Sequence, residues 1–357
     1  MATRFASARH QAALGVPTGY RRWTRVSASR GGVSANLEPV GGSFTQDATR
    51  SGRWDARLTF AGDEHLPERP GDLLSPFGTI VEVELGLELL DGSVSSVPYG
   101  TYEIGSARTR SVAGERVVDV GLIDVSGQVD RYRYEEPFVV PTGTDLAQMV
   151  NAVVTSRVGV NPAVTPTGST LGANRIFGLD PETGPWAELQ DVLTGFSRQA
   201  WYNRVGHIEI GSPTADPGAA YSLSSLASLS ADFDTRPPNV VVARGEAQDG
   251  QPPVQAVAMD EDPGSPTYAG TGPGTSPYGR VTRFYASPLL TTEGMAQSAA
   301  NTILAGFVGA GATFTLVVPY DPTIDANDVV SAKGLALAVD QVTMTLQGDT
   351  SLQVRRV

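Results

Sequence analysis

The clearest alternation of apolar and polar residues lies between Leu66 and Arg108. A period of two residues is typical of a β-strand with one buried face. Asp91-Gly92 then favours a tight turn, because glycine tolerates a positive φ, and a second strand is expected over Thr101–Ala107. The stretch therefore predicts a long hairpin, and nothing in it indicates catalysis. Its apolar side holds Val81, Val83, Leu85, Leu87 and Leu89, and its polar side holds Glu82, Glu84 and Glu88, interrupted by Gly86.

Short strands of the same kind fill the chain from residue 21 to residue 136. Roughly seven strands separated by turn residues are typical of a small barrel or sandwich. Such a sheet hides strand edges that would otherwise pair with other chains. We therefore expect a first β-barrel over 21–136, after an N-terminal arm over 1–20 that is flexible alone or ordered against a neighbour. Its other expected strands are Trp23–Ala28, Val33–Val40, Trp54–Phe60 and Glu115–Asp124.

The apolar period lengthens to that of a helix after Pro137. Thr144 is placed to cap a helix over Asp145–Arg157, and Pro185 suits the first position of a second helix. A hairpin over 201–210 completes a small α/β module over 137–215. Helical spacing alone explains the apolar stripes, so we interpret them as core and not as a cofactor site. They are Leu146, Met149, Val150, Val153 and Val154 in the first helix, and Trp186, Leu189, Val192, Leu193 and Phe196 in the second.

Strands resume at Asn239, and residues 216–357 are expected to form a second β-barrel domain. An Ala-rich helix at about 292–307 interrupts this domain, and its small residues would permit close packing. The predicted packing face holds Met295, Ala299, Ile303 and Phe307, and the closing strands are Ala312–Val318, Val339–Leu346 and Ser351–Val357, the last two joined across Gly348-Asp349.

Two loops of this region resemble ligand sites only superficially. Asp260-Glu261-Asp262 lacks the alternating oxygen ligands and the closing Glu of a calcium loop, so we interpret it as a solvated acidic loop. The glycines of 270–279 are spaced somewhat like a dinucleotide fingerprint. However, this segment does not link a strand to a helix, and it contains Pro273 and Pro277, so a loop is expected.

Composition supports a β-rich chain of two or three domains. Of the 357 residues, 40% are hydrophobic and 18% charged, with 40 Gly and 25 Pro to supply turns. The absence of cysteine excludes disulfides, thiolate metal sites and cysteine nucleophiles. His10, His65 and His207 are the three histidines, and their separation argues against a histidine-rich metal site.

The net charge of −12 argues against a double-stranded DNA binder, which normally carries a basic patch. The longest apolar runs fall short of the roughly 18 residues of a transmembrane helix. The first 15 residues lack the apolar core of a signal peptide. We therefore expect synthesis in a host cytoplasm, without export by the general secretion route.

Catalytic motifs are missing from the sequence. It contains no G-x-S-x-G elbow, no Walker A loop and no H-E-x-x-H pair. Its densest carboxylate groups, Glu135-Glu136 and Asp260–Asp262, lie at a domain edge or in a loop, where exposure explains them. We expect no enzyme activity, no cofactor, and no catalytic or metal-binding residues, although counting carboxylates does not exclude a two-carboxylate glycosidase.

Two passages carry a family resemblance. Residues 73–104 (LLSPFGTIVEVELGLELLDGSVSSVPYGTYEI) run from proline and glycine through a strand into a P-x-G-x-Y-x-I strand. Residues 122–157 contain Asp-x-Ser and Asp-Arg, followed by a proline-led entry into a helix. These features resemble the tail-hub minor tail proteins of long-tailed phages, particularly actinobacterial ones, which are similar to the baseplate hub of contractile tails. The resemblance covers about residues 20–215, and the C-terminal third matches mainly in element order.

The resemblance implies a structural protein of the virion tail tip. In such hubs, three subunits with two similar barrels each form a six-fold-like ring that adapts a hexameric tail tube to a three-fold tip. The implied partners are other copies of the chain, the distal tail protein, the C-terminus of the tape-measure protein, and tail-tip fibre or spike proteins. DNA would pass an acidic lumen without specific binding. Any cell-wall hydrolase would then belong to another protein.

Two alternatives stay open. A hub of a contractile phage or contractile injection system would share the same fold. A carbohydrate-binding or glycosidase β-protein would suit the β-rich composition and the aromatic residues Trp23, Trp201 and Tyr320, which are expected at the surface. For the hub, the candidate assembly or lumen residues are Glu82, Glu84 and Glu88, whose face is otherwise merely solvated.

Overall fold

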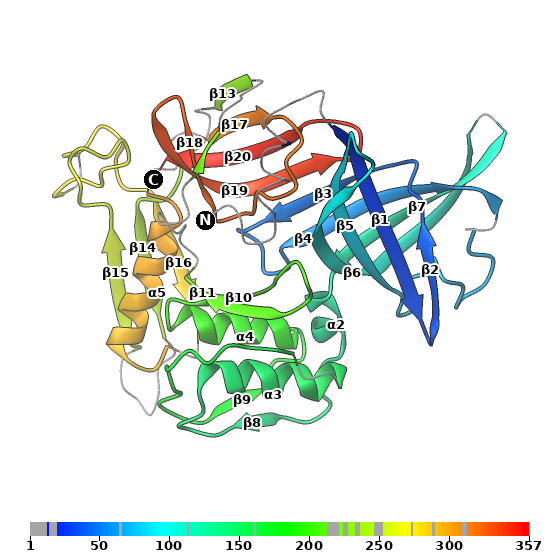
Figure 1. Cartoon of the computed structure of the whole chain (residues 1–357). Helices are drawn as coiled ribbons and strands as arrows, with labels where there is room; N and C mark the ends of the chain where they lie inside the picture. The colour runs from blue at the N-terminus through cyan, green and yellow to red at the C-terminus, as the bar shows by residue number, and fades with distance from the viewer. Residues whose placement is uncertain are drawn as a thin grey trace.

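The chain is mainly β and folds into three connected regions (Figure 1). A large sheet occupies the upper part of the view, a helical module lies below it, and a small sheet covered by one helix lies to the left. Of the N-terminal arm expected over 1–20, all but Ala13 and Tyr20 lies outside the described residues. The computed structural model describes residues 13, 20–63, 66–112, 114–159, 162–212, 221–223, 228–232, 236–245, 253–272, 274–287, 290–308 and 313–356.

The large sheet has 13 strands, drawn from both ends of the chain. Its order along the hydrogen-bonded path is β13-β17-β20-β19-β3-β4-β7-β6-β5-β1-β2, with β18 paired to β19 and β12 paired to β18. In sequence order the strands are β1 (Tyr20–Arg30), β2 (Val33–Leu37), β3 (Gly41–Asp47), β4 (Trp54–Ala61), β5 (Ile80–Leu89), β6 (Val94–Val112), β7 (Glu115–Asp124), β12 (Tyr221–Ser222), β13 (Ser228–Asp232), β17 (Thr313–Val318), β18 (Val329–Ala332), β19 (Leu335–Thr345) and β20 (Thr350–Arg356).

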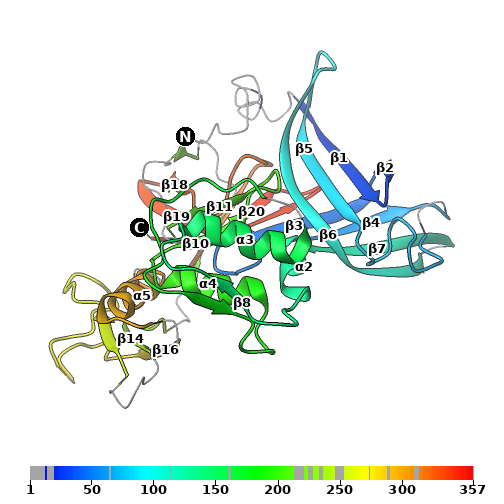
Figure 2. The same cartoon turned by 90° about the horizontal axis from the view of Figure 1, so that it is seen from below.

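The pairing of β3 with β19 joins the N-terminal and C-terminal strands into this one sheet. Phe44 of β3 lies opposite Met344 of β19, and both side chains are fully buried. Figures 1 and 2 show β1 to β7 curving around a shared interior, which is filled by a single apolar cluster. Among the described strands no hydrogen-bonded pair joins β2 to β3, so closure of a barrel stays a prediction.

The hairpin predicted from the alternation is confirmed as β5 and β6. Val81, Val83, Leu85 and Leu87 are all at most 2% exposed, so the apolar side faces the core as expected. The second strand is much longer than predicted. A bulge between Ile104 and Ser106 is followed by continued pairing of β6 with β7.

Two strand predictions need correction at the start of the chain. The strand expected over Val33–Val40 ends at Leu37, since Pro39 has no N–H for the ladder. The strand β3 was not predicted, because the sequence GGSFTQD has no apolar alternation. Its place between β4 and β19 is set by tertiary pairing and not by local pattern.

The helical module packs three helices against two small two-stranded sheets, β8-β9 and β10-β11. The two predicted apolar stripes are buried together in one core cluster, with Phe196 partly buried at its edge. The helix α2 was not predicted, because it is only six residues long. The elements are α2 (Ser126–Arg131), β8 (Phe138–Val140), α3 (Leu146–Val158), β9 (Arg175–Phe177), α4 (Pro185–Thr194), β10 (Gln199–Tyr202) and β11 (Ile208–Gly211).

The cap of α3 is Asp145 and not Thr144. The Asp145 carboxylate accepts hydrogen bonds from the backbone N–H of Ala147 at 2.8 Å and of Gly168 at 2.9 Å. It thereby satisfies one of the free donors at the helix start and also fastens the loop before β9. Burial raises the pKa of Asp145, but hydrogen bonds from Ala147, Thr167 and Gly168 outweigh it, so the pKa lies below its ordinary value.

Replacing Asp145 by alanine should lower the free energy of unfolding by about 1 kcal/mol at neutral pH. Because the pKa of the folded carboxyl is depressed, its contribution is present above the unfolded value of about 4. The contribution is lost as the pH falls through the folded pKa. Urea unfolding at pH 7 and pH 3 measures both effects. Asp145→Asn, which keeps a capping oxygen, is the control, and an equal loss from Ala and Asn would contradict the capping role.

The third region is a three-stranded sheet covered by one helix. Its central strand β14 pairs antiparallel with β15 and parallel with β16. The helix predicted near 292–307 is confirmed here, with Thr292 as its cap, and it packs on this sheet. The elements are β14 (Val240–Arg244), β15 (Gln255–Met259), β16 (Thr282–Ala286) and α5 (Glu293–Ala305).

The packing face predicted for α5 was only partly right. Ala299 is buried as expected, but the other buried residues are Ala296, Ala300 and Leu304, while Met295 and Ile303 are partly buried. The small side chains let the helix lie close to the sheet, so the face is set by alanines more than by the larger residues.

The acidic loop after β15 was predicted to be solvated, and this prediction is wrong for Asp260. Asp260 is only 4% exposed, and it accepts hydrogen bonds from the hydroxyl groups of Ser265 at 2.5 Å and Thr267 at 2.6 Å. The carboxylate therefore organises the loop internally.

Candidate assembly site

A buried arginine joins the helical module to both halves of the large sheet. Arg204 lies in the turn between β10 and β11 and is 2% exposed. It forms an ion pair with Asp325 at 2.7 Å and donates hydrogen bonds to the carbonyl oxygens of Ile324 at 3.0 Å, of Pro322, and of Pro98 at 3.4 Å. Pro98 belongs to β6, and the other three acceptors precede β18. One guanidinium therefore links three parts of the fold.

The ionised state of Arg204 is maintained despite its burial. Burial acts to lower the pKa of Arg204, but the carboxylate of Asp325 and the buried Tyr99 hydroxyl outweigh it and hold the pKa above its ordinary value. The guanidinium also lies over the Tyr99 ring, 4.9 Å from its centroid. A buried cation is costly unless it is paired in this way.

Two tryptophans form a second junction between the sheet and the module. The indole N–H of Trp54 in β4 donates to the backbone oxygen of Tyr202 at 2.8 Å. In return, the indole N–H of Trp186 in α4 donates to the backbone oxygen of Ser51 at 3.0 Å. The rings of Trp186 and Tyr202 stack with centroids 5.4 Å apart. The sheet donates one of these hydrogen bonds and the module donates the other, so each part contributes one tryptophan to the junction.

Arg53 extends this junction. It is 2% exposed, donates to the side-chain oxygen of Gln199 at 3.1 Å, and lies 4.0 Å from the centroid of the Trp201 ring. Burial lowers the pKa of Arg53 to about 10, so it remains a cation at neutral pH. Trp201 was expected at the surface, but one face of its ring is covered by this arginine. Tyr320 was also expected there, and it is 2% exposed and part of the core, which weakens the case for a carbohydrate platform.

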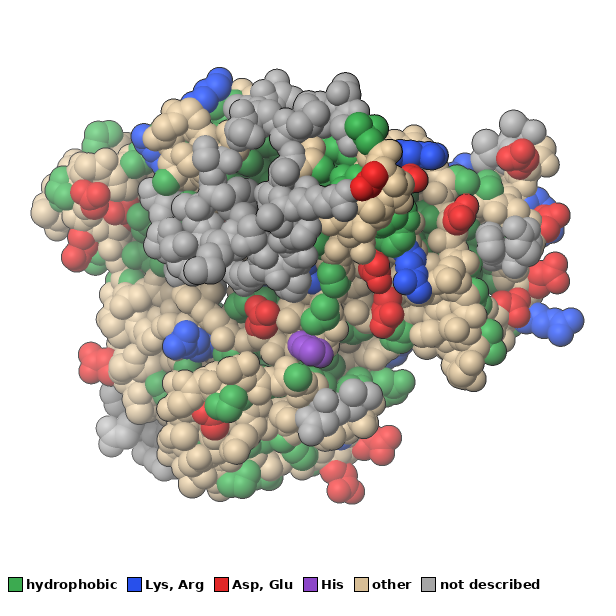
Figure 3. All heavy atoms as spheres, in the orientation of Figure 1, with side chains coloured by type: hydrophobic (Ala, Val, Ile, Leu, Met, Phe, Trp, Pro, Cys, Tyr) green, Lys and Arg blue, Asp and Glu red, His purple; other side chains and the backbone are tan. Residues whose placement is uncertain are grey.

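The three candidate glutamates lie together on the outer face of β5, as their spacing predicted. Glu84 faces Arg25 of the neighbouring strand β1, with 3.9 Å between the carboxylate oxygen and the guanidinium nitrogen, and Glu88 faces Arg21 of β1 at 4.0 Å. Glu82 is exposed beside them. In Figure 3, acidic and basic side chains lie next to each other over β1, β5 and β6. Exposed pairs of this kind contribute at most about 1 kcal/mol each, so this ladder is a surface feature and not a source of stability.

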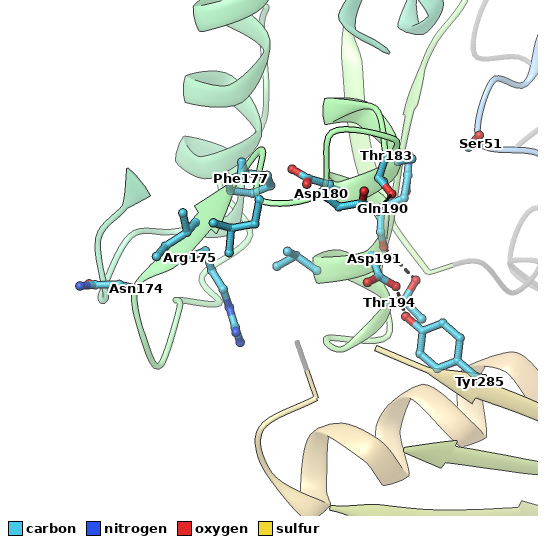
Figure 4. Close-up of a pocket in the computed structure, with 15 residues that line it drawn as sticks. Ser51, Asn174, Arg175, Phe177, Asp180, Thr183, Gln190, Asp191, Thr194 and Tyr285 are labelled. Carbon is cyan, nitrogen blue, oxygen red and sulfur yellow. Dashed lines mark hydrogen bonds between the residues drawn. The ribbon is translucent and has the colours of Figure 1, made fainter. Parts of the chain in front are cut away.

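A pocket of about 730 Å³ lies where the helical module meets the third region (Figure 4). Asp191 of α4 accepts hydrogen bonds from the hydroxyl groups of Tyr285 and of Ser287, the latter at 2.6 Å. Burial, and then the charge of Asp191, raises the pKa of the Tyr285 hydroxyl. The lining comprises Ser51, Asn174, Arg175, Ile176, Phe177, Leu179, Asp180, Thr183, Ala187, Glu188, Gln190, Asp191, Val192, Thr194 and Tyr285.

The carboxylates of the pocket accept hydrogen bonds from backbone N–H groups and neighbouring hydroxyl groups. Glu188 accepts from the N–H of Gly178 at 2.8 Å, and Asp180 accepts from the N–H of Glu182 at 2.9 Å and the hydroxyl of Thr183 at 2.7 Å. Carboxylates used in this way position the loop and helix around the pocket. Across the described part of the chain, no group of three or more His, Asp or Glu side chains is placed to hold a metal ion.

None of the helices within the described residues has the length and apolar character to cross a membrane. No protein-family model matches the chain, and no curated protein sequence matches it.

Solved structures of similar fold cover almost the whole chain. The 43 kDa tail protein of prophage MuSo2 from Shewanella oneidensis matches with a TM-score of 0.63 and 11% identity, over 94% of this chain and 98% of that one. The tail protein from Neisseria meningitidis MC58 matches with a TM-score of 0.61 and 15% identity, over 93% and 96%.

A third match comes from a secretion apparatus. An Escherichia coli component of the type VI secretion system, described as structurally similar to the T4 bacteriophage tail proteins gp27 and gp5, matches with a TM-score of 0.54 and 7% identity. It is covered over 76% of its length, and this chain over 92%. The chain therefore has the mainly β fold, with a smaller α/β module, that is shared by these two tail proteins and this type VI secretion component.

Proposed function

We propose that the chain is a structural hub protein at the tip of a phage tail. The observation that carries this proposal is the likeness to the Shewanella prophage tail protein, which spans 94% of this chain and 98% of that one. A match over both full lengths means that the whole architecture is shared, and not one common domain. The proposed location is accordingly the virion tail.

In this proposal three copies form a ring that lines the DNA passage. Each copy has two β-regions in one sheet, β1 to β7 and β12, β13 and β17 to β20. Three such copies offer six β-regions to a hexameric tube while keeping three-fold symmetry below it. The proposal also divides the chain as 1–20, 21–136, 137–215 and 216–357, and it includes the distal tail protein, the tape-measure C-terminus and tail-tip fibre or spike proteins as partners.

The buried junctions between the helical module and the large sheet support a structural role. Arg204, Arg53 and Trp186 are all at most 2% exposed and tie the module to the sheet. Such contacts limit movement between the parts, which suits a rigid adaptor. Burial is the main cause of the raised pKa values of Tyr99 and Tyr102, which lie in the core.

Charge reversal tests whether the glutamate face takes part in assembly. We expect the triple change Glu82→Lys, Glu84→Lys and Glu88→Lys to disturb ring assembly or DNA passage, because it opposes like charges to Arg25 and Arg21. Particle counts by electron microscopy and infectious titre measure the effect. The triple glutamine variant is the matched control, and a milder defect is expected from it. Normal particles and titre with all three charges reversed would show that this face is only solvated.

A hub of a contractile injection system is the second candidate function. The likeness to the Escherichia coli type VI component, with its TM-score of 0.54, favours it. The two candidates differ in the particle that contains the chain. Mass spectrometry of purified particles decides between them, since sheath proteins belong only to the contractile kind.

A further inference from the structure

Arg175 is buried in the pocket of Figure 4 without a hydrogen-bond partner. It lies on β9 opposite Val140 and is 5% exposed. Its Nε is fully covered and unpaired, and within the described residues no hydrogen bond or ion pair involves its guanidinium. Its side chain extends from β9 into the pocket space (Figure 4). A buried donor without a partner opposes folding, and in Arg175 this donor belongs to a cation that lines a pocket.

The acidic residues of the pocket form no ion pair with Arg175 and have other hydrogen-bond partners. Asp191 is engaged by Tyr285 and Ser287, and Glu188 by the N–H of Gly178. Burial lowers the pKa of Arg175, and none of the ion pairs among the described residues includes its guanidinium. The pocket therefore presents a cation that is available to an anion from outside.

The rim of the pocket is apolar and exposed. Ile176 is 45% exposed and Leu179 is 67% exposed. Val139, directly opposite Ile176 in the β8–β9 ladder, is 52% exposed. Large apolar side chains gathered at the mouth of a pocket are typical of a surface that another chain covers.

We propose that this pocket is a docking site for a peptide segment of a neighbouring protein, with one carboxylate between apolar side chains. The carboxylate pairs with the planar guanidinium of Arg175, which can donate two parallel hydrogen bonds. The flanking apolar side chains cover Ile176, Leu179 and Val139. The volume of about 730 Å³ accommodates several side chains. The docking site itself is independent of the proposed function. Only the inference that the neighbouring protein is a tail protein rests on it.

Defined peptides test the proposal on the full-length protein. The probes are two fluorescein-labelled, amidated peptides, Ala-Leu-Glu-Leu-Ala and Ala-Leu-Gln-Leu-Ala, which differ only in the carboxylate. Fluorescence polarisation should show at least about tenfold tighter binding of the Glu peptide. Arg175→Gln should remove that difference, and Leu179→Ser should weaken the binding of both peptides. Arg108→Gln, an exposed change outside the pocket, is the control and should leave binding unchanged.

Thermal unfolding separates binding from folding. Arg175→Gln should leave the Tm unchanged or raise it, because it removes an unpaired buried charge. Equal affinities for the two peptides, or no binding of either peptide up to about 1 mM, would each overturn the proposal. If Arg175→Gln folds poorly, Leu179→Ser still tests the site, because unchanged peptide binding in this variant would contradict the proposed apolar contact. Peptide binding without ring formation would refute the hub and leave the docking site standing.

Discussion

Replacing Arg204 with methionine should lower the free energy of unfolding by about 3–5 kcal/mol. The change leaves Asp325 and three backbone oxygens without their donor at the junction of module and sheet. The loss is large because a buried network that loses one member keeps the desolvation cost of the others. Urea denaturation, followed by tryptophan fluorescence, measures the effect at Trp54 and Trp186, which lie at the neighbouring junction.

A double-mutant cycle isolates the ion pair. Asp325→Asn alone should cost less than Arg204→Met, and the double variant should cost less than the sum of the two. Arg356→Met, an exposed change at the end of β20, is the matched control and should stay within about 0.5 kcal/mol. A loss below about 1 kcal/mol in Arg204→Met would mean that the junction does not depend on this cation.

The second large effect is expected at Trp186. Its change to alanine should cost about 3–5 kcal/mol, because it removes a 1% exposed ring stacked on Tyr202 and the hydrogen bond to Ser51. Trp186→Phe keeps an aromatic ring and loses only the N–H donor, so about 1–2 kcal/mol is expected. Chemical denaturation at equilibrium gives both values.

The comparison of the two substitutions distinguishes packing from hydrogen bonding. If Phe costs as much as Ala, the bond to Ser51 is the main anchor and the stack is secondary. Leu90→Ala, at an 86% exposed position of the β5–β6 turn, is the control and should change stability by at most about 0.5 kcal/mol. A neutral Trp186→Ala would contradict the view that this junction fixes the module on the sheet.

The local sequence pattern predicted the strands and helices whose buried residues follow a regular spacing. The alternation around Val83 specified β5 and its buried face, and the helical stripes around Met149 and Leu189 specified α3 and α4. The error at the start of α3 was small, since Thr144 and Asp145 are both good caps and only geometry selects between them. The face of α5 was misjudged because alanines were given too little weight beside Met295.

Long-range pairing and buried charge could not be read from one sequence. The two β-regions form one sheet because β3 pairs with β19. Neither strand contains a sequence pattern that identifies the other as its partner. Arg204 and Arg175 look like surface residues, since arginine is seldom buried. Only the structure shows that the first is fully paired and the second, within the described residues, is not. The glutamates of β5 were placed correctly on one face, but their role in assembly is still a prediction.

A cryo-EM reconstruction of the particle that contains the chain tests the hub proposal most directly. The proposal predicts a ring at the tail tip built from three copies, with two β-regions of each facing the tube and a central passage. Density for the chain elsewhere in the particle, or a single copy without a ring, would contradict it.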